Sequence, residues 1–95
     1  MTVEWSPLAV ADVKAIHAYI AKDSLVAAER MVVRIKEAVE RLADFPPMGR
    51  AGRVAGTREF VIPGSSYICA YLIQSDCVHV AAVLHGKQSW PKGFR

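Results

Sequence analysis

The sequence predicts a single α+β domain over residues 1–95, in which two helices follow a short strand and precede three further strands. Three observations lead to this prediction. Apolar residues recur at helical spacing through the first half of the chain, two consecutive prolines end that pattern, and three strand-like runs separated by short turns follow. The chain has 95 residues, 53% apolar and 22% charged, a composition typical of one globular domain. The expected order of elements is β-α-α-β-β-β.

The start of the chain is expected to form a short strand and then the first helix. Residues 2–5, TVEW, are β-prone. Ser6 is a candidate N-cap because its hydroxyl can accept a hydrogen bond from the first turn, and Pro7 suits the first helical position, where a missing N–H costs nothing. The apolar residues that follow lie on one side of a helix, at Ala9, Val13, Ile16 and Ile20.

A second helix is expected after a break at Lys22 and Asp23. Ser24 is its candidate N-cap, and the helix must end near Phe45 because Pro46 and Pro47 cannot extend it. The connection between the helices is only a few residues long, so the two should pack as an antiparallel hairpin. The apolar stripe of this helix consists of Ala28, Met31, Val32, Ile35, Val39 and Leu42.

Three strands are predicted in the second half of the chain. They cover residues 57–62, 67–73 and 77–84, and the turns between them are so short that neighbouring strands should be antiparallel. The middle run is apolar on both faces, which places it at the centre of the sheet. The glycine-rich stretch MGRAGRVAG before these strands is expected to be a loop.

The composition excludes several classes of protein. No apolar run approaches the roughly 18 residues that a membrane span requires, and the N-terminus lacks the basic and apolar regions of an export signal. Cys69 and Cys77 lie in or beside predicted strands without the spacing of a metal site, which favours reduced thiols in a cytoplasmic protein. We therefore expect neither a metal site nor a cofactor.

Positive charge is concentrated in the second half of the chain. The net charge is +3, but residues 1–44 hold six Lys or Arg against seven Asp or Glu, whereas residues 45–95 hold six against two. A surface with this bias attracts phosphates or acidic protein segments. The excess is modest and falls short of that of a dedicated duplex-binding domain.

The motif VLHGKQSWP places an imidazole, an ammonium, an amide and an indole directly after an apolar strand. We interpret it as the rim of a positively biased surface that binds phosphate or a protein target. A plainer interpretation stays open, in which the histidine bonds to the backbone and Trp90 anchors the C-terminal tail. The residues predicted to form this surface are Arg50, Arg53, Arg58, Lys87, Gln88 and Trp90.

Five stretches, taken together and in order, carry a family resemblance: WSPLAVADVKAIHAYI, AAERMVVRIKEAVERLADFPPMGRAG, GTREFVI, YICAYLI and VLHGKQSWP. The chain resembles, over residues 3–91, the RelE/ParE superfamily of toxins from bacterial type II toxin–antitoxin systems. The resemblance implies a helical hairpin packed on a twisted antiparallel sheet. It also implies a protein partner, the cognate antitoxin, which neutralises the toxin in a hetero-oligomer.

The resemblance leaves three functions open. RelE-like members cut mRNA in the ribosomal A site, ParE-like members inhibit DNA gyrase, and some relatives are inactive. RNA cleavage needs an activated 2′-hydroxyl, cations and a proton donor, and the candidates in a nuclease would be Arg58, His85 and Lys87. Ribosome-dependent relatives have an arginine just after the tyrosine that opens the middle strand, where this chain has Ile68. Its absence favours the ParE-like function, which is not enzymatic.

Antitoxin binding is expected on the helical hairpin. An amphipathic helix of the antitoxin would cover exposed apolar side chains there, and an extended segment would meet the sheet. A chain this small and 53% apolar is expected to hide part of its apolar surface in a complex. The candidate residues at the outer edge of the hairpin are Val26, Met31 and Val33.

Overall fold

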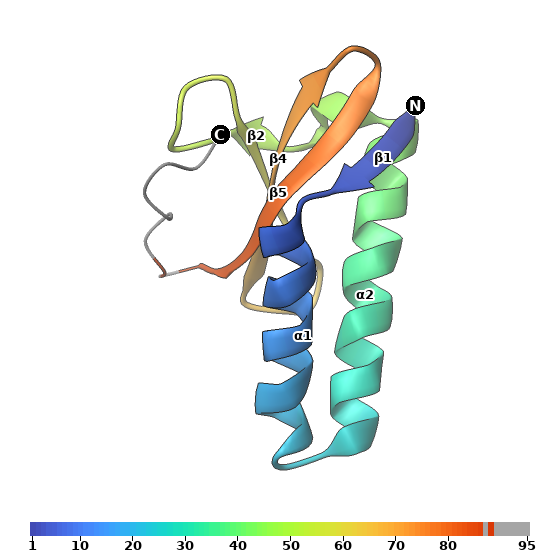
Figure 1. Cartoon of the computed structure of the whole chain (residues 1–95), viewed down its shortest axis with the longest axis vertical. Coiled ribbons are helices and arrows are strands. Elements are labelled where there is room, and N and C mark those ends of the chain that lie inside the picture. Colours follow the sequence, from blue (N-terminus) through green and yellow to red (C-terminus); the bar gives the residue numbers. More distant parts are fainter. Residues whose placement is uncertain (87, 89–95) are drawn as a thin grey trace.

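The predicted order of helices and strands is confirmed by a computed structural model, which describes residues 1–86 and residue 88. Figure 1 shows the two helices lying side by side next to the sheet. The elements are β1 Thr2–Trp5, α1 Pro7–Ala21, α2 Leu25–Asp44, the 3-10 turn η1 Pro46–Met48, β2 Arg50–Ala51, β3 Arg58–Val61, β4 Tyr67–Gln74 and β5 Cys77–His85. The sequence did not predict η1 or β2, and β2 lies in the stretch expected to be a loop.

Both helices begin at the predicted caps. The Ser6 hydroxyl accepts a hydrogen bond from the Ala9 N–H at 3.0 Å, and the Ser24 hydroxyl accepts one from the Ala27 N–H at 3.1 Å. Each bond satisfies an N–H that the helix itself cannot pair, which stabilises the helix by about 1 kcal/mol. The chain reverses at residues 22–24, so the helices form the predicted antiparallel hairpin (Figure 1).

The sheet contains five strands in the order β1-β5-β4-β3-β2. Neighbouring strands from β2 to β5 are antiparallel, and β4 lies at the centre, as predicted. The sheet is mixed rather than purely antiparallel, because β1 pairs with β5 in parallel. A parallel pair needs a long crossover connection, which the helical hairpin and the intervening strands provide. The first strand of the chain therefore lies at an edge of the sheet, held by the last one.

Two tight turns fix the register of β3, β4 and β5. Gly64, in the first turn, has φ 73°, a conformation that glycine adopts at little cost. The second turn consists of Ser75 and Asp76, with φ of 51° and 55°. Positive φ at both central residues is the signature of the two-residue turn whose twist matches that of the adjoining strands. A one-residue slip would move every side chain to the wrong face, so these turns help to fix the core.

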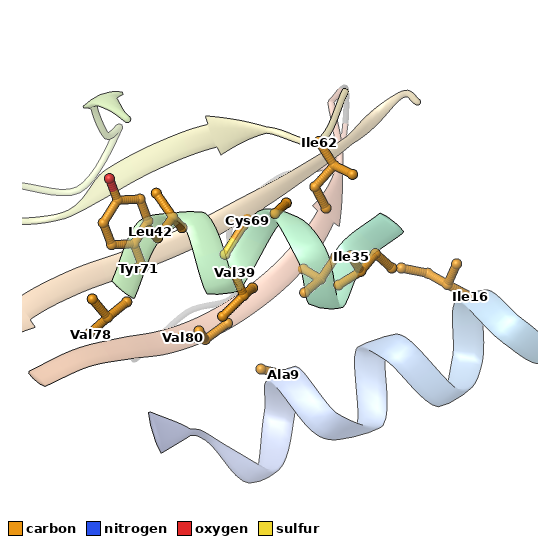
Figure 2. Close-up of a cluster of buried hydrophobic side chains, with 12 residues drawn as sticks. Ala9, Ile16, Ile35, Val39, Leu42, Ile62, Cys69, Tyr71, Val78 and Val80 are labelled. Atoms are coloured by element: carbon orange, nitrogen blue, oxygen red, sulfur yellow. The ribbon is translucent and has the colours of Figure 1, made fainter. Parts of the chain in front are cut away.

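The main core lies between the helical hairpin and one face of the sheet (Figure 2). Side chains of α2 fill its middle, and buried side chains of β4 and β5 meet them from the sheet. The opposite face of the sheet carries a smaller buried cluster of Ala70, Ala82 and Leu84. The main cluster consists of Ala9, Ile16, Ile35, Ala38, Val39, Leu42, Ile62, Cys69, Tyr71, Val78, Val80 and Val83.

α1 is fixed to β5 at an irregularity in that strand. The register between β4 and β5 shifts so that Ala81 has no partner in β4. Ser6 donates its backbone N–H to the Val80 carbonyl at 2.9 Å and its hydroxyl to the Ala81 carbonyl at 2.8 Å. The Asp12 carboxylate accepts a hydrogen bond from the Val83 N–H at 2.9 Å. Burial raises the pKa of Asp12, and the bond from Val83 opposes that shift.

Both cysteines are free and buried. Burial raises the pKa of the Cys69 thiol to about 12, so this side chain stays protonated and unreactive at neutral pH. Among the residues that the structure describes, no helix is both long and apolar enough to cross a membrane.

Candidate functional site

The residues predicted to bind a target lie around β2, β3 and the end of β5. Lys87 and Trp90, which belong to the same prediction, lie outside the described residues. The other candidates are Arg50 in β2, Arg53 in the loop after it, Arg58 in β3, His85 at the end of β5, and Gln88.

Glu59 of β3 is the centre of a polar network that includes two of the predicted arginines. Its side chain is only 3% exposed. One carboxylate oxygen accepts a hydrogen bond from Arg50 Nη2 at 3.4 Å, while the other accepts the Arg53 backbone N–H at 2.9 Å and lies 3.3 Å from Arg53 Nε. Removing a carboxylate from water is costly unless it gains such partners. Arg50 and Arg53 therefore compensate a buried charge before they serve any other purpose.

Arg53 also holds the chain that leaves β5. Its guanidinium donates to the Gln88 carbonyl at 2.7 Å and to the Gly86 carbonyl at 3.3 Å. The Gln88 side chain in turn accepts a hydrogen bond from the His85 N–H at 3.2 Å. The structure thus brings Gln88 next to Arg53, through the backbone of Gln88. One arginine connects the buried Glu59 to the segment that follows the last strand.

Arg58 does not belong to this network, because it lies on the opposite face of the sheet. Successive side chains of a strand alternate between faces. Arg58 is paired with Tyr71 of the main core, whereas Glu59 is paired with Ala70 of the smaller cluster. The expectation of one continuous surface containing all three arginines is therefore wrong. Strand alternation separates Arg58 from the other two.

Arg58 and Tyr71 together hold the segment from η1 to β2 on the helix-covered face. Arg58 Nη1 donates to the carbonyls of Gly49 at 2.8 Å and Pro47 at 3.3 Å. The buried Tyr71 hydroxyl donates to the Pro46 carbonyl at 2.6 Å and accepts the Gly49 N–H at 2.9 Å. Burial raises the pKa of Tyr71, although the bond from Gly49 and the charge of Arg58 act in the other direction. A Cβ on Gly49 would lie 2.6 Å from the tyrosine oxygen, so this approach requires glycine.

The two described candidates for nuclease chemistry do not converge. Arg58 and His85 are paired with Tyr71 and Tyr67, four positions apart on β4, and they belong to the strands on either side of it. At about 3.3 Å per residue and about 4.8 Å between strands, their Cα atoms lie roughly 16 Å apart. His85 is exposed and packs edge-to-face against Tyr67, with ring centroids 5.9 Å apart. Ile68, which replaces the arginine of ribosome-dependent relatives, is 5% exposed.

Two of the three predicted antitoxin-binding residues lie together on the outer face of α2. Val26 is 61% exposed and Val33 is 53% exposed, and they stand about two turns apart. Met31 does not share this face, because it is half-buried and packs against the main core. Two positions along a helix correspond to about 200° of rotation, so Met31 and Val33 point to opposite sides. The two valines line a shallow groove of about 530 Å³ together with Glu29, Arg30, Arg34 and Glu37.

A second groove lies between α1 and α2, beside the end of β1. It has a volume of about 510 Å³, and cationic side chains rim an apolar floor. Sequence reasoning missed it because Val10, which is 40% exposed, lies off the predicted stripe of α1. A signal was present in the sequence, because the groove is lined by valines of both helices, Val10 and Val13 of α1 and Val32 of α2. The groove is lined by Trp5, Val10, Val13, Lys14, His17, Val32 and Lys36.

One group of described side chains has the chemistry of a metal site. Glu4 of β1 and Cys77 and His79 of β5 each offer a ligand atom, and these atoms lie within 4.8 Å of one another. Sequence reasoning missed this group, because Glu4 and Cys77 are 73 residues apart. Only the parallel pairing of the first strand with the last brings them together.

Comparisons with known proteins agree with the resemblance seen in the sequence. A family model described as the ParE toxin of the type II toxin–antitoxin system parDE matches residues 3–90. A protein described as a toxin, Y4kP of Sinorhizobium fredii, is 42% identical over 90 residues, which are 95% of this chain and 93% of that protein. Toxin RelE2 of Caulobacter vibrioides is 35% identical over 83 residues, which are 87% of this chain and 92% of that toxin.

A solved structure has the same fold. A chain of the chromosomal ParDE toxin–antitoxin system from P. aeruginosa superposes with a TM-score of 0.82, covering 90% of this chain and 95% of that one. The sequence identity is 22%, so this likeness bears on the fold. The family model spans nearly the whole sequence, and the two curated relatives, both described as toxins, are matched along most of their length. The chain therefore belongs to the ParE toxin family of type II toxin–antitoxin systems.

Proposed function

We propose that this toxin inhibits DNA gyrase by binding to it, without catalysing a reaction of its own. The observation that carries the proposal is the separation of the described residues that a nuclease would use. Arg58 and His85 lie on different strands roughly 16 Å apart. Ile68 is buried at the position where ribosome-dependent relatives have an arginine. An inhibitor that acts by docking needs a stable surface rather than a converging set of catalytic groups.

The hydrogen bonds of the arginines support the same proposal. Stabilising the charge of a cleavage transition state requires donors aimed at the phosphate. Arg53 donates to two carbonyls and lies against Glu59, and Arg58 donates to two other carbonyls. Redirecting either guanidinium to a phosphate would first break bonds of about 1.5–3 kcal/mol each. This cost disfavours both arginines as catalytic cations.

The target-binding surface that we propose is centred on Arg50. Its side chain is 63% exposed and makes one long contact of 3.4 Å with Glu59. Gln88, exposed and held next to Arg53, extends the same surface. Lys87 belongs to the proposal on sequence grounds, as does Trp90. The cationic excess of the second half of the chain suits an acidic surface on the target.

Gyrase inhibition is tested by adding the purified toxin to gyrase and relaxed plasmid. Supercoiling should stop, or cleaved DNA should accumulate, at toxin concentrations close to that of gyrase. Arg50→Ala should weaken inhibition about fivefold, because it removes one exposed charge from the interface. Arg30→Ala, an exposed arginine of α2, is the matched control and should inhibit as well as the wild type. Gyrase that works normally at excess toxin would refute the proposal.

Ribosome-dependent cleavage of mRNA is the second candidate function. It is favoured by the 35% identity to a toxin named RelE2. Translating ribosomes programmed with mRNA should stay intact if the toxin is a gyrase inhibitor. Cut message would replace the first proposal, and His85→Ala should then lower cleavage by about 100-fold or more. An inactive relative, the third possibility, would not arrest growth when expressed without antitoxin in the cytoplasm, where we place the protein.

The family implies an antitoxin partner, and we propose that this partner covers the outer face of α2. Val26 and Val33 lie in a groove whose rim carries both positive and negative charges, which suits an amphipathic helix. Exposed apolar side chains that lie together mark a protein-binding surface, because an interface removes them from water.

Antitoxin affinity tests this second part of the proposal. Val26→Asp and Val33→Asp should each weaken binding by about 30-fold or more, equivalent to about 2 kcal/mol. Val61→Asp on β3 is the matched control, because Val61 is also exposed, at 46%. Gyrase inhibition should be unchanged in the two α2 variants, which separates antitoxin binding from toxicity. Unchanged antitoxin affinity in both would place the antitoxin elsewhere.

A further inference from the structure

We propose that Glu4, Cys77 and His79 bind one Zn²⁺ ion, with a fourth coordination position left for water. The three side chains supply a carboxylate, a thiolate and an imidazole from two neighbouring strands. This proposal concerns an edge of the sheet and does not depend on whether the toxin acts on gyrase or on ribosomes.

The backbone places the three ligands on one face of the sheet. Cys77 and His79 are two residues apart on β5, so strand alternation directs both side chains to the same side. Glu4 is paired directly with His79 in the parallel register of β1 and β5. Their neighbours Val78 and Val80 belong to the main core. The ligands therefore point away from the helices, toward the face where an ion can enter.

Two of the three distances between ligand atoms match those around a tetrahedral zinc ion, and the third, between the ligand atoms of Cys77 and His79, is within 4.8 Å. Zn–S is about 2.3 Å and Zn–N and Zn–O are about 2.0–2.2 Å, so tetrahedral angles place N and O about 3.4 Å apart and S and O about 3.5 Å apart. In the structure, His79 Nδ1 lies 3.4 Å from Glu4 Oε1, and Cys77 Sγ lies 3.4 Å from the same oxygen. The site needs only small side-chain movements to close around an ion.

The donor set selects the class of metal. Thiolate and imidazole ligands suit Zn²⁺ and related transition metals, whereas Mg²⁺ and Ca²⁺ prefer oxygen ligands alone. Cys77 is only 7% exposed, while the side chains of His79 and Glu4 are 34% and 69% exposed. The sulfur is thus shielded and the site stays open on one side. An adjacent pocket of about 340 Å³, lined in part by His79, Glu4 and Gln74, has room for a water ligand.

Metal binding would clamp the first strand of the chain to the last. β1 is an edge strand, and Ser6 immediately after it caps α1. In the structure the Cys77 thiol donates its hydrogen to Glu4. Binding of Zn²⁺ releases that proton to solvent as the thiolate coordinates the ion. Because the ion binds only the folded arrangement of β1 on β5, it should raise the unfolding midpoint of the protein.

Cobalt titration of the purified, reduced full chain tests the proposal. Co²⁺ replaces Zn²⁺ in such sites and gives a sulfur-to-cobalt charge-transfer absorption when a thiolate coordinates it. We expect one ion per chain, a dissociation constant of about 1 µM or below, and loss of the absorption when Zn²⁺ is added. The buried Cys69 is an internal control, because it lies in the main core away from the site.

Single substitutions assign the ligands. Cys77→Ser should abolish the charge-transfer absorption although Cys69 is still present. His79→Asn and Glu4→Gln should each weaken metal binding at least tenfold. The matched control is His17→Asn, which removes a histidine paired with a carboxylate, Glu29, at 3.2 Å but without a nearby thiol. This variant should bind the metal as well as the wild type.

Each outcome of these titrations decides the proposal. Wild-type protein that shows no charge-transfer absorption, or that binds Zn²⁺ only at millimolar concentrations, would overturn it. Binding that survives in Cys77→Ser, or that is lost equally in His17→Asn, would overturn it too. Circular dichroism shows whether each variant is folded. If Cys77→Ser does not fold, the two variants at exposed side chains, His79→Asn and Glu4→Gln, decide the assignment.

Discussion

Two polar networks hold the segment of residues 46–53 on opposite faces of the sheet, and they differ in chemistry. On the helix-covered face, the neutral hydroxyl of Tyr71 bonds to the Pro46 carbonyl and the Gly49 N–H. On the other face, the charged carboxylate of Glu59 binds Arg50 and the Arg53 backbone. The centre of the first network, Tyr71, is buried in the core, and Arg58 beside it donates to the Gly49 and Pro47 carbonyls. The centre of the second, Glu59, is also buried, and its charge is balanced by arginines that reach solvent.

The comparison shows that the arginines of this region are structural before they are functional. The guanidinium groups of Arg53 and Arg58 donate hydrogen bonds to backbone carbonyls, one on each face of the sheet, and so hold the chain in place. Of the two arginines that contact Glu59, Arg50 has the more exposed side chain, at 63% against 40% for Arg53. Substitutions at the buried centres of the two networks should therefore act mainly on stability.

The largest effect is expected from Gly49→Ala, which disrupts the network at Tyr71. The added Cβ would lie 2.6 Å from the Tyr71 oxygen and 2.8 Å from the Glu59 carbonyl oxygen. Overpacking together with loss of the Tyr71 hydrogen bonds should lower the free energy of unfolding by about 4 kcal/mol. Urea unfolding followed by circular dichroism measures it. Gly86→Ala is the control, because its Cβ would meet nothing closer than 3.4 Å and should cost little. Equal effects of the two substitutions would contradict the close approach at Gly49.

The second largest effect is expected from Glu59→Ala, which breaks the charged network. Arg50 and Arg53 lose their shared partner, so the free energy of unfolding should fall by about 3 kcal/mol. Glu59→Gln keeps oxygen and shape but not charge, and should cost about half as much. The same urea titrations measure both, with Glu40→Ala on the exposed side of α2 as the control. If Glu59→Gln were as stable as the wild type, shape rather than charge would hold this network.

The order of helices and strands was predictable because their ends are encoded by local sequence signals. Ser6 and Ser24 are caps, and the two prolines after Phe45 end the second helix. The turn residues around Gly64 and Ser75 indicate the two hairpins. The parallel pairing of β1 with β5 has no such signal, because it depends on how the whole chain closes.

The candidate site was predictable only in part, for a related reason. The sequence shows that Arg58 and Glu59 are adjacent, but it does not show which face of the sheet each will occupy. Met31 was placed with Val33 on the helix surface, although a rotation of about 200° separates them. The ligand group at Cys77 was missed because its carboxylate comes from the other end of the chain. Long-range pairing decides the first and the third of these, whereas helix periodicity alone separates Met31 from Val33.

A smaller effect is expected from Tyr71→Phe, which removes only the hydroxyl of the network at Tyr71. The Gly49 N–H and the Pro46 carbonyl would lose their partner, at a cost of about 1.5 kcal/mol in the free energy of unfolding. Because burial raises the pKa of Tyr71 above its ordinary value of 10.0, the folded state holds this proton more tightly than the unfolded state does. Wild-type stability should therefore fall as the pH rises above about 10, and the gap to Tyr71→Phe should narrow. Tyr19→Phe, at an exposed position, should change nothing; a gap that stays constant with pH would show that Tyr71 does not titrate in this range.

The smallest effect is expected at Asp12, where a charge rather than a neutral group is placed at the helix-covered face. Burial raises the pKa of Asp12 from its ordinary value of 3.8, so the folded state binds its proton more tightly than the unfolded state does. The contribution of Asp12 to the free energy of unfolding should accordingly decrease as the pH rises from below 3.8 through the raised pKa of the folded state. Above that pKa the full cost of burying the charged carboxylate is present. Asp12→Asn keeps an oxygen for the Val83 N–H and removes the charge. It should raise the free energy of unfolding at pH 7 by less than about 0.5 kcal/mol, because solvent screens this half-buried group.

Urea titrations of the wild type and Asp12→Asn measure this effect between about pH 3.5 and 7, a range that brackets the titration of a carboxyl group. The difference between the two proteins reports Asp12 alone, because all other carboxylates are common to both. Asp12→Ala, which removes the acceptor as well, should be less stable than either. If Asp12→Asn were instead destabilising at pH 7, the bond from Val83 to a charged oxygen would outweigh the cost of burying it. The helix-covered face would then tolerate a buried carboxylate as well as the Glu59 side does.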